Sequence, residues 1–354
     1  GIYTEIARAN TTASGSDYDV FSTPGAQAPA TCATSMFVVD DQQQAAPSGS
    51  VLYTWNPTTG QTTVSVGPLK NGTTTTDTHG IAAYTTWPNY VFYVDYVSLK
   101  LMYYDTVSKT TTPFPNLSAA AASGTLAFDA EGYLYNVSDF KVMYLTPAQV
   151  SALIANPATT ATWNTGASLS YTGSQGSLWN VADIAIDGDG VMYLLSQGGS
   201  TRDFIKVTTT VARTPGAATA TVIKTFNNSW YRGMAFIGSD LYIGESGGSQ
   251  AGTYGGLANI YKINVTTGAL TQVTSPAYTV KNVSDMGSCS FPKLVNPPPT
   301  GPAYKVQKSI INPDGSVAAA GTTGAPQTLN PDGTVTIDYV ITVTAVGTTA
   351  GTFP

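Results

Sequence analysis

Charged residues are scarce in this sequence, and their scarcity limits the partners the chain can have. Only 10% of its 354 residues are Asp, Glu, Lys or Arg, against about a quarter in typical soluble domains. The 15 Lys and Arg are outnumbered by 21 Asp and Glu, which gives a formal net charge of −6. Because phosphate backbones bind to basic surfaces, nucleic acid is not an expected partner.

Histidine is nearly absent as well, and this argues against the common catalytic arrangements. The single histidine, His79, could act as a general base, but no nucleophile motif and no carboxylate pair accompanies it in the sequence. A polar residue that lines a channel is therefore the favoured interpretation. We expect no enzymatic activity, no catalytic residues, no bound metal and no cofactor.

No run of about 20 apolar residues occurs, so no membrane insertion is expected. Threonine is abundant, as in residues 73–76, and the sequence begins at Gly1 rather than at a methionine. Strands rich in hydroxyl groups are typical of surface-exposed chains. We therefore predict a secreted protein, extracellular or at the cell surface, whose signal peptide has been removed.

A short pattern recurs along the chain: an apolar strand, a turn, and then an aromatic strand. The clearest copies begin at Gly124, Asp183 and Gly233, and fainter copies begin at His79 and Ser284. Repeats at a spacing of about 50 residues are typical of modular β architectures, of which the propeller is the usual one. The pattern predicts an all-β chain built around a β-propeller.

The order of strands within the repeats predicts how the ring closes. Each complete repeat opens with one strand, called here its first strand. The repeat at Met36 lacks this opening strand. At the other end, an opening strand near residues 283–289 has no second strand after it. Joined, these two ends make one complete blade. Counting first strands predicts five blades, and the long stretch 146–180, with an expected helix at 147–154, leaves room for a sixth.

Composition divides the chain into five parts. They are a lone donor-type strand at 1–10, a linker at 11–30, the propeller at 31–292, a Pro-rich linker at 293–303 and a small β domain at 304–354. The last part has twin Asn-Pro-Asp-Gly turns and one long strand with strictly alternating apolar residues.

Two stretches resemble known families. Cys32 near the start, the Leu-Tyr strands with Thr-Thr-Gly turns, and the closing Asp285-Met-Gly-Ser-Cys289 resemble a secreted bacterial propeller family of unknown function. Residues 304–354 resemble the opening of the Ig-like conserved repeat domain of bacterial surface proteins. This second resemblance implies a β-sandwich of about seven strands, of which the stretch supplies about three. An incomplete Ig-like domain is therefore expected.

The two cysteines, Cys32 and Cys289, lie just before the first repeat strand and at the end of the last one. They are either two unrelated buried thiols or a disulfide, because secreted proteins oxidise such pairs. Their placement favours the disulfide, which would join the two ends of the ring.

Several charged residues allow two interpretations. Asp129-Ala-Glu-Gly132 and Asp187-Gly-Asp-Gly190 could be calcium loops, but neither continues into a ligand ladder that ends in Glu, so hairpin turns are favoured. Asp183, Asp285 and Arg232 stand near the starts of first strands. They could form a polar funnel on the axis, but buried hydrogen bonds between blades are the favoured interpretation.

The two ends of the chain predict how it assembles. Residues 1–10 are expected to form a strand without a partner of its own. Residues 304–354 are expected to leave one edge of a long strand unpaired. Because unpaired edges recruit further strands, the first segment of one copy could pair with the second segment of another. The expected strand-exchange interface comprises Ile2, Thr4, Ile6, Val335, Ile337, Tyr339, Ile341 and Val343. A head-to-tail contact of this kind does not close, so it makes filaments. We predict a structural subunit of an extracellular filament or surface layer, with copies of itself as partners.

Two other functions remain open on the sequence. The propeller could be an adhesin that binds a cell-surface glycan or a host protein, because exposed Trp87, Trp163, Trp179 or Trp230 could stack on sugars. Packing between blades is the simpler role for the repeated aromatic residues. A propeller hydrolase is the third function, and it would need several carboxylates and a metal at the channel mouth.

Overall fold

The computed structural model describes residues 35–41, 49–56, 64–76, 78, 80–120, 125–172, 180–197, 201–227, 231–245, 248–249, 253–254, 259–273, 280, 283–294, 304–318 and 338–345. The chain divides into two compact units. One is Ala28–Leu294, and the other combines Gly1–Gln27 with Val295–Pro354.

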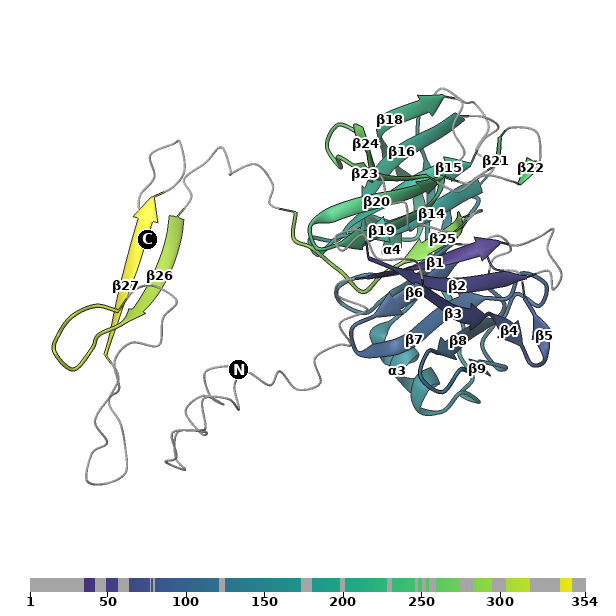
Figure 1. The fold of residues 1–354 in the computed structure, drawn as a ribbon, viewed down its shortest axis with the longest axis horizontal. Coiled ribbons are helices and arrows are strands. Elements are labelled where there is room, and N and C mark those ends of the chain that lie inside the picture. The colour runs from purple at the N-terminus through teal and green to yellow at the C-terminus, as the bar shows by residue number, and fades with distance from the viewer. Residues whose placement is uncertain are drawn as a thin grey trace. The chain divides into compact units, whose positions relative to one another are not determined.

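The first unit is a β-propeller, as the repeats predicted (Figure 1). Its described residues form five blades, each a sheet of four or five strands. Blade 1 contains, in sheet order, β25 (Val283–Gly287), β1 (Met36–Asp41), β2 (Ser50–Trp55) and β3 (Val64–Pro68). Blade 2 contains β6 (Ile81–Tyr84), β7 (Trp87–Val94), β8 (Leu101–Asp105) and β9 (Thr110–Pro113).

The other three blades follow along the chain. Blade 3 contains β10 (Thr125–Phe128), β11 (Leu134–Ser138), β12 (Lys141–Leu145), β13 (Asn164–Ser170) and β17 (Gly216–Thr219). Blade 4 contains β14 (Asn180–Ile186), β15 (Val191–Gln197), β16 (Thr201–Thr208) and β18 (Thr221–Asn227). Blade 5 contains β19 (Tyr231–Ile237), β20 (Asp240–Glu245), β23 (Ile260–Ile263) and β24 (Leu270–Val273).

Short elements decorate these blades. Two small hairpins pair β4 (Lys70–Asn71) with β5 (Thr74–Thr75) and β21 (Gly248–Ser249) with β22 (Thr253–Tyr254). The helices are α3 (Pro147–Ala155) and α4 (Thr209–Arg213).

The ring closes through the last strand of the propeller, as predicted. β25 pairs antiparallel with β1, so that Val38 lies opposite Met286 and Val39 lies opposite Asp285. Blade 1 therefore takes its innermost strand from the end of the propeller and its other three strands from the start.

The stretch 146–180 adds no sixth blade within the described residues. It begins with α3, where Thr146 and Gln149 form a capping box and Pro147 occupies the first turn, a combination that favours a helix start. It continues with β13, the fourth strand of blade 3. β13 then pairs in parallel with β17, which comes from later in the chain.

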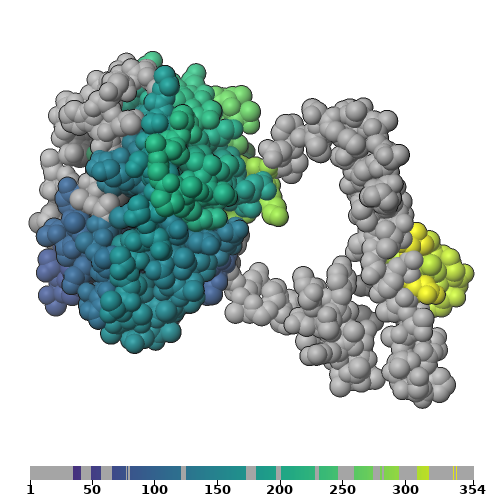
Figure 2. Space-filling view, turned by 180° about the vertical axis from the view of Figure 1, so that it is seen from behind, coloured from purple at the N-terminus to yellow at the C-terminus, as the bar shows by residue number. Residues whose placement is uncertain are grey.

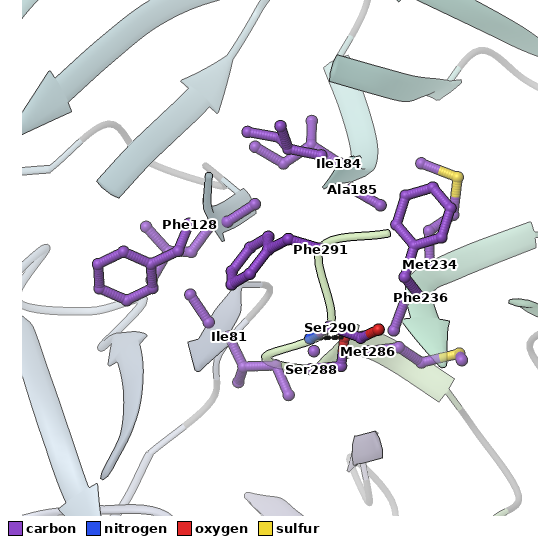
Figure 3. Close-up of a pocket in the computed structure, with 16 residues that line it drawn as sticks. Ile81, Phe128, Ile184, Ala185, Met234, Phe236, Met286, Ser288, Ser290 and Phe291 are labelled. Carbon is purple, nitrogen blue, oxygen red and sulfur yellow. Dashed lines mark hydrogen bonds between the residues drawn. The ribbon is translucent and has the colours of Figure 1, made fainter. Parts of the chain in front are cut away.

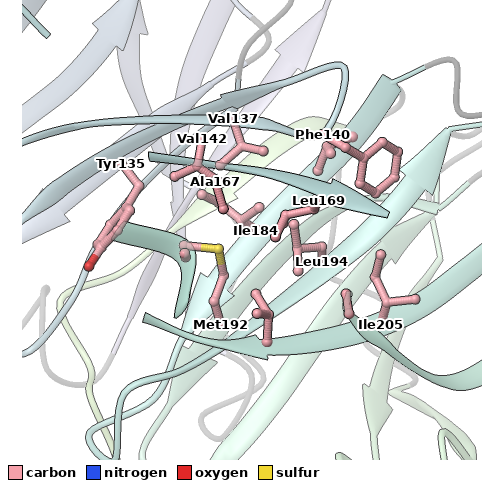
Figure 4. Close-up of a cluster of buried hydrophobic side chains, with 14 of the residues drawn as sticks. Tyr135, Val137, Phe140, Val142, Ala167, Leu169, Ile184, Met192, Leu194 and Ile205 are labelled. Carbon is pink, nitrogen blue, oxygen red and sulfur yellow. The ribbon is translucent and has the colours of Figure 1, made fainter. Parts of the chain in front are cut away.

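The hydrophobic core consists of five clusters, one between each pair of neighbouring blades. In the cluster between blades 3 and 4, Val137 and Ala167 of blade 3 face Ile184, Met192 and Leu194 of blade 4 (Figure 4). The innermost strands β10 and β25 are buried along their whole length. Small and branched side chains there let the blades pack closely around the axis. The face drawn in Figure 2 is formed mainly by blades 2 to 4, coloured blue to green.

In the second unit the structure describes one two-stranded antiparallel sheet. β26 (Tyr304–Ile310) pairs with β27 (Tyr339–Ala345), with Lys308 opposite Ile341. The first strand and the long alternating strand of the expected Ig-like domain are thus paired. Further strands of such a domain are not among the described residues.

Candidate functional site

Two acidic side chains meet at the centre of the propeller. Asp183 lies on β14 and Asp285 on β25, and neither has any exposed surface. The two carboxyl groups are close enough to shift each other's pKa, and among the described residues Oδ1 of Asp285 has no hydrogen-bond donor of its own. Two buried carboxyl groups this close resist being ionised together.

Donors from other blades surround this pair. The backbone N–H of Ile81 donates to Oδ2 of Asp285 at 3.1 Å, and that of Met234 donates to Oδ2 of Asp183. Thr125 Oγ1 lies 2.7 Å from Oδ1 of Asp183 and 3.3 Å from Oδ2 of Asp285. These residues belong to β6, β19 and β10, so the innermost strand of every blade contributes to one hydrogen-bond network, the carboxyl hub.

The environment of the hub raises the pKa of both acids. Burial raises the pKa of Asp183 to about 7, although hydrogen bonds from Thr125 and from Asp285 oppose that rise. Burial and the neighbouring charge of Asp183 raise the pKa of Asp285 well above its ordinary value. The pair therefore keeps a proton to a higher pH than an exposed carboxyl group would.

The interpretation that acidic residues hold the blades together is confirmed for Asp183 and Asp285. Arg232 lies on β19 near a second cation, Arg202. Burial and the charge of Arg232 lower the pKa of Arg202 to about 10, and Arg202 Nε donates to the carbonyl of Tyr231 at 3.3 Å. His79 lies outside the described residues.

At one end of the channel a short segment crosses the mouth. Residues 288–294, the exit strap, leave β25 and pass between the innermost strands, with Phe291 among Ile81, Phe128, Ile184 and Phe236 (Figure 3). The cavity that remains has a volume of about 20 Å³, which is enough for about one water molecule.

Contacts to three blades hold the exit strap in place. The carbonyl of Pro292 accepts a 2.7 Å hydrogen bond from the N–H of Gly188 in blade 4. Ser290 Oγ donates to the carbonyl of Gly238 in blade 5 at 3.2 Å. The ring of Phe291 packs on Tyr84 of blade 2, with 5.8 Å between centroids. This end of the channel is therefore closed by the chain itself.

The two candidate calcium loops are turns whose carboxylates are already engaged. Asp187 Oδ1 accepts the N–H groups of Asp189 and Val191 at 3.0 and 2.9 Å, and its Oδ2 accepts the Tyr193 hydroxyl. Asp129 repeats this pattern with the N–H groups two and four residues on and the Tyr135 hydroxyl. The favoured interpretation, hairpin turns, is confirmed.

An arginine side chain also contacts the turn at Asp129. Arg213 of α4 lies 3.0 Å from Oδ2 of Asp129 and stacks over the ring of Tyr133. This ion pair ties α4, which lies in the sequence between β16 of blade 4 and β17 of blade 3, to the Asp129 turn of blade 3. Among the described residues, no group of three His, Cys, Asp or Glu side chains could hold a metal ion.

The tryptophans that could stack on sugars are only partly described. Trp163 is 7% exposed and packs in the core between blades 2 and 3, which removes it as a sugar platform. Trp87 is half-buried in the same core. Trp179 and Trp230 lie outside the described residues.

Cys289 is 4% exposed and packs between blades 1 and 2. No free cysteine thiol occurs in the part of the chain that the structure describes. Cys32 lies outside that part, so its pairing with Cys289 stays a prediction.

The predicted strand-exchange residues divide into two groups. Tyr339, Ile341 and Val343 lie on β27. The others, Ile2, Thr4, Ile6, Val335 and Ile337, fall outside the described residues. Within the described residues, β26 and β27 each have one partner strand.

Two functional positions were not predicted. Thr125 stands at the start of β10, and alignment of the five first strands would have placed it beside the acidic positions. Phe291 follows the last strand and has no counterpart in the repeats, so no repeat pattern could identify it as a channel plug.

Within the described residues, no helix is long and apolar enough to cross a membrane.

No protein-family model matches the chain, and no curated protein matches it. Neither resemblance drawn from the sequence is therefore established at the level of a family. Solved structures resemble the chain only distantly, so the fold rests on its own sheets.

Three of these solved structures illustrate how distant the similarity is. A chain of a nidogen–laminin complex is 10% identical, with a TM-score of 0.43 over 73% of this chain and 81% of that one. A protein of unknown function from Bacteroides thetaiotaomicron VPI-5482 is 12% identical, with a TM-score of 0.38 over 55% and 50%. The Kuenenia stuttgartiensis hydrazine synthase is 10% identical, with a TM-score of 0.35 over 66% and 64%.

Proposed function

We propose that this protein is a structural subunit of an extracellular filament or surface layer and has no enzymatic activity. Subunits assemble head to tail when the strand at residues 1–10 of one copy adds to the 304–354 sheet of the next. The observation that carries this proposal is the two-stranded sheet of β26 and β27. Among the described residues, β26 and β27 have no other partner strand. A two-stranded sheet is marginally stable in water, and an unpaired strand edge recruits another strand.

The sequence of the N-terminal segment suits it to that role. Ile2, Thr4 and Ile6 alternate with Tyr3 and Glu5, so that a strand at 1–10 has one mostly apolar face. Burying Ile2 and Ile6 would contribute about 1.5–3 kcal/mol each before the cost of ordering. The linker at 11–30 supplies reach, at most about 3.3–3.6 Å per residue.

The propeller supports a structural rather than a catalytic role. Its paired carboxyl groups have no exposed surface, and the exit strap fills one mouth of the channel. A general acid or base must come within hydrogen-bond reach of its substrate. The hub acids hold blades together instead, which suits a rigid unit in a filament.

The test compares the full chain with a variant that lacks residues 1–10. We expect the full chain to form polymers in sedimentation and electron microscopy. The shortened chain should stay monomeric, and its thermal unfolding should keep the propeller transition. A matched control replaces Tyr3 and Glu5 by Thr, which keeps the strand pattern and should still assemble. A shortened chain that polymerises normally, or a full chain that stays monomeric at high concentration, would overturn the proposal.

A further inference from the structure

The hydrogen bonds at the end of the β26–β27 sheet show which residues face which edge. The N–H of Ile311 donates to the carbonyl of Asp338 at 2.9 Å, so Ile311 faces β27. Along an antiparallel strand the backbone groups of successive residues face opposite edges. Ile310 must then face away from β27. It does, because its carbonyl accepts the N–H of Ala318 at 2.9 Å.

The register extends this alternation along β27. Val340 pairs with Ser309 and Thr342 with Gln307, two and four residues on from Asp338, so their backbone groups face β26. The residues between them face the opposite, outer edge. The outer edge of β27 thus presents the N–H and C=O groups of Tyr339, Ile341, Val343 and Ala345.

The outer edge of β26 is different, because the chain itself folds back onto its end. The turn at 312–316 is closed by the N–H of Asn312, which donates to the carbonyl of Ser316 at 2.8 Å. Beyond the turn, Val317 pairs with Ile311. The segment after β26 therefore occupies the last part of its outer edge. A strand added there would have to displace it.

We propose that the acceptor is the outer edge of β27, so that the sheet order is incoming strand, β27, β26. This inference rests on the proposed function and names the site that the function leaves unspecified. The occupant is residues 1–10 of a second copy, bound through the backbone groups of Tyr339, Ile341, Val343 and Ala345.

Proline substitution on one rung of the sheet tests this assignment. Ile341 and Lys308 lie directly opposite each other, and both have backbone groups that face outward. Proline removes one N–H and is tolerated on a strand edge, so each variant blocks one outer edge and keeps the β26–β27 hydrogen bonds. We expect Ile341→Pro to reduce polymer at least ten-fold in sedimentation, and Lys308→Pro to assemble like the unaltered chain.

Hydrogen exchange gives a second readout that does not depend on either variant folding. A synthetic peptide of residues 1–10 is added to the chain that lacks them. The amides of Tyr339, Ile341 and Val343 should exchange at least ten-fold more slowly with peptide. Those of Val340 and Thr342, which already face β26, should change little.

The outcomes separate this inference from the proposed function. If Lys308→Pro loses polymer while Ile341→Pro keeps it, or if the peptide protects β26 instead of β27, the edge assignment is wrong and strand addition stands. If the chain without residues 1–10 polymerises, or if the peptide protects no amide in either strand, strand addition itself fails, and the edge assignment fails with it.

Discussion

Asp183 and Asp285 meet, both without exposed surface, inside a hydrogen-bond network that the innermost strands of all five blades reach. Asp183 comes from the middle of the propeller, whereas Asp285 comes from β25, the strand that closes the ring. The network is therefore completed only when the ring closes. Each buried donor that it satisfies would cost free energy if left unpaired, so the hub favours the closed ring.

The two hub acids should respond differently to the same substitution. Asp285 accepts the N–H of Ile81 on Oδ2, while its Oδ1 has no donor among the described residues. An asparagine there can accept from Ile81 and turn its amide N–H toward Asp183. Asp183 accepts on both oxygens, from Met234 and Thr125, so an asparagine there turns a donor toward donors. We expect Asp183→Asn to lower the unfolding free energy by about 1–3 kcal/mol and Asp285→Asn to lower it by less. Urea denaturation of both variants checks this, and equal losses would contradict the expected difference between the two positions.

The hub also predicts how stability depends on pH. Because the pKa values of both acids are raised, the folded chain binds more protons than the unfolded chain. The contribution of the hub to the unfolding free energy is then fully present below the ordinary pKa of 3.8. It falls as the pH rises through the raised pKa of Asp183, about 7, and continues to fall toward the raised pKa of Asp285. The fall is about 1.4 kcal/mol per pH unit for each extra proton kept.

Other carboxylates also make stability depend on pH. In Asp95, burial raises the pKa, but hydrogen bonds from Ser98, Thr76 and Asn71 lower it overall. Comparing the unaltered chain with Asp285→Asn separates the effect of the hub from theirs. The stability of the variant should decline less steeply than that of the unaltered chain between pH 4 and 7. Identical slopes in urea titrations across that range would show that the hub does not hold the extra protons.

The propeller could be predicted from the sequence because each repeat carries its own pattern of apolar strand residues and turn residues. Gly124, Asp183 and Gly233 each open the same strand, turn and strand pattern, and each pattern can bury its apolar residues only against a neighbouring copy. Ring closure followed from the same logic, because the strand at β25 lacks a second strand and the repeat at Met36 lacks a first. These features depend on contacts that are near in sequence or regular in spacing.

The details of the hub and the strap could not be predicted, because they depend on contacts with no regular spacing. The sequence placed Asp183 and Asp285 near the axis, but it could not show that both are fully buried and joined to three other blades, since that depends on how all five blades pack. Phe291 belongs to no repeat, and β17 pairs with β13 after an excursion of the chain through α4. Such placements are set by tertiary packing alone.

The exit strap should be sensitive to one glycine beneath it. A Cβ on Gly188 would lie 2.4 Å from the carbonyl oxygen of Phe291 and 3.1 Å from Pro292, so the strap would have to move. We expect Gly188→Ala to cost about 1–3 kcal/mol and to speed trypsin cleavage after Lys293 of the strap. Asp189→Ala, in the same turn but exposed, is the matched control and should stay within about 0.5 kcal/mol. Equal cleavage rates for the two variants would show that the strap does not rest on Gly188.

The predicted disulfide would act at the point where the ring closes. Cys289 comes two residues after Gly287, the end of β25, and is buried between blades 1 and 2. A bond from there to Cys32 would join the closing strand to the start of the propeller, which limits the freedom of the unfolded chain. Thiol titration of the denatured, unreduced protein should find no free thiol. Reduction, or replacement of both cysteines by serine, should lower the unfolding free energy by about 2–4 kcal/mol. Two titratable thiols in the unreduced protein would show that the ring closes through β25 and the carboxyl hub without a covalent bond.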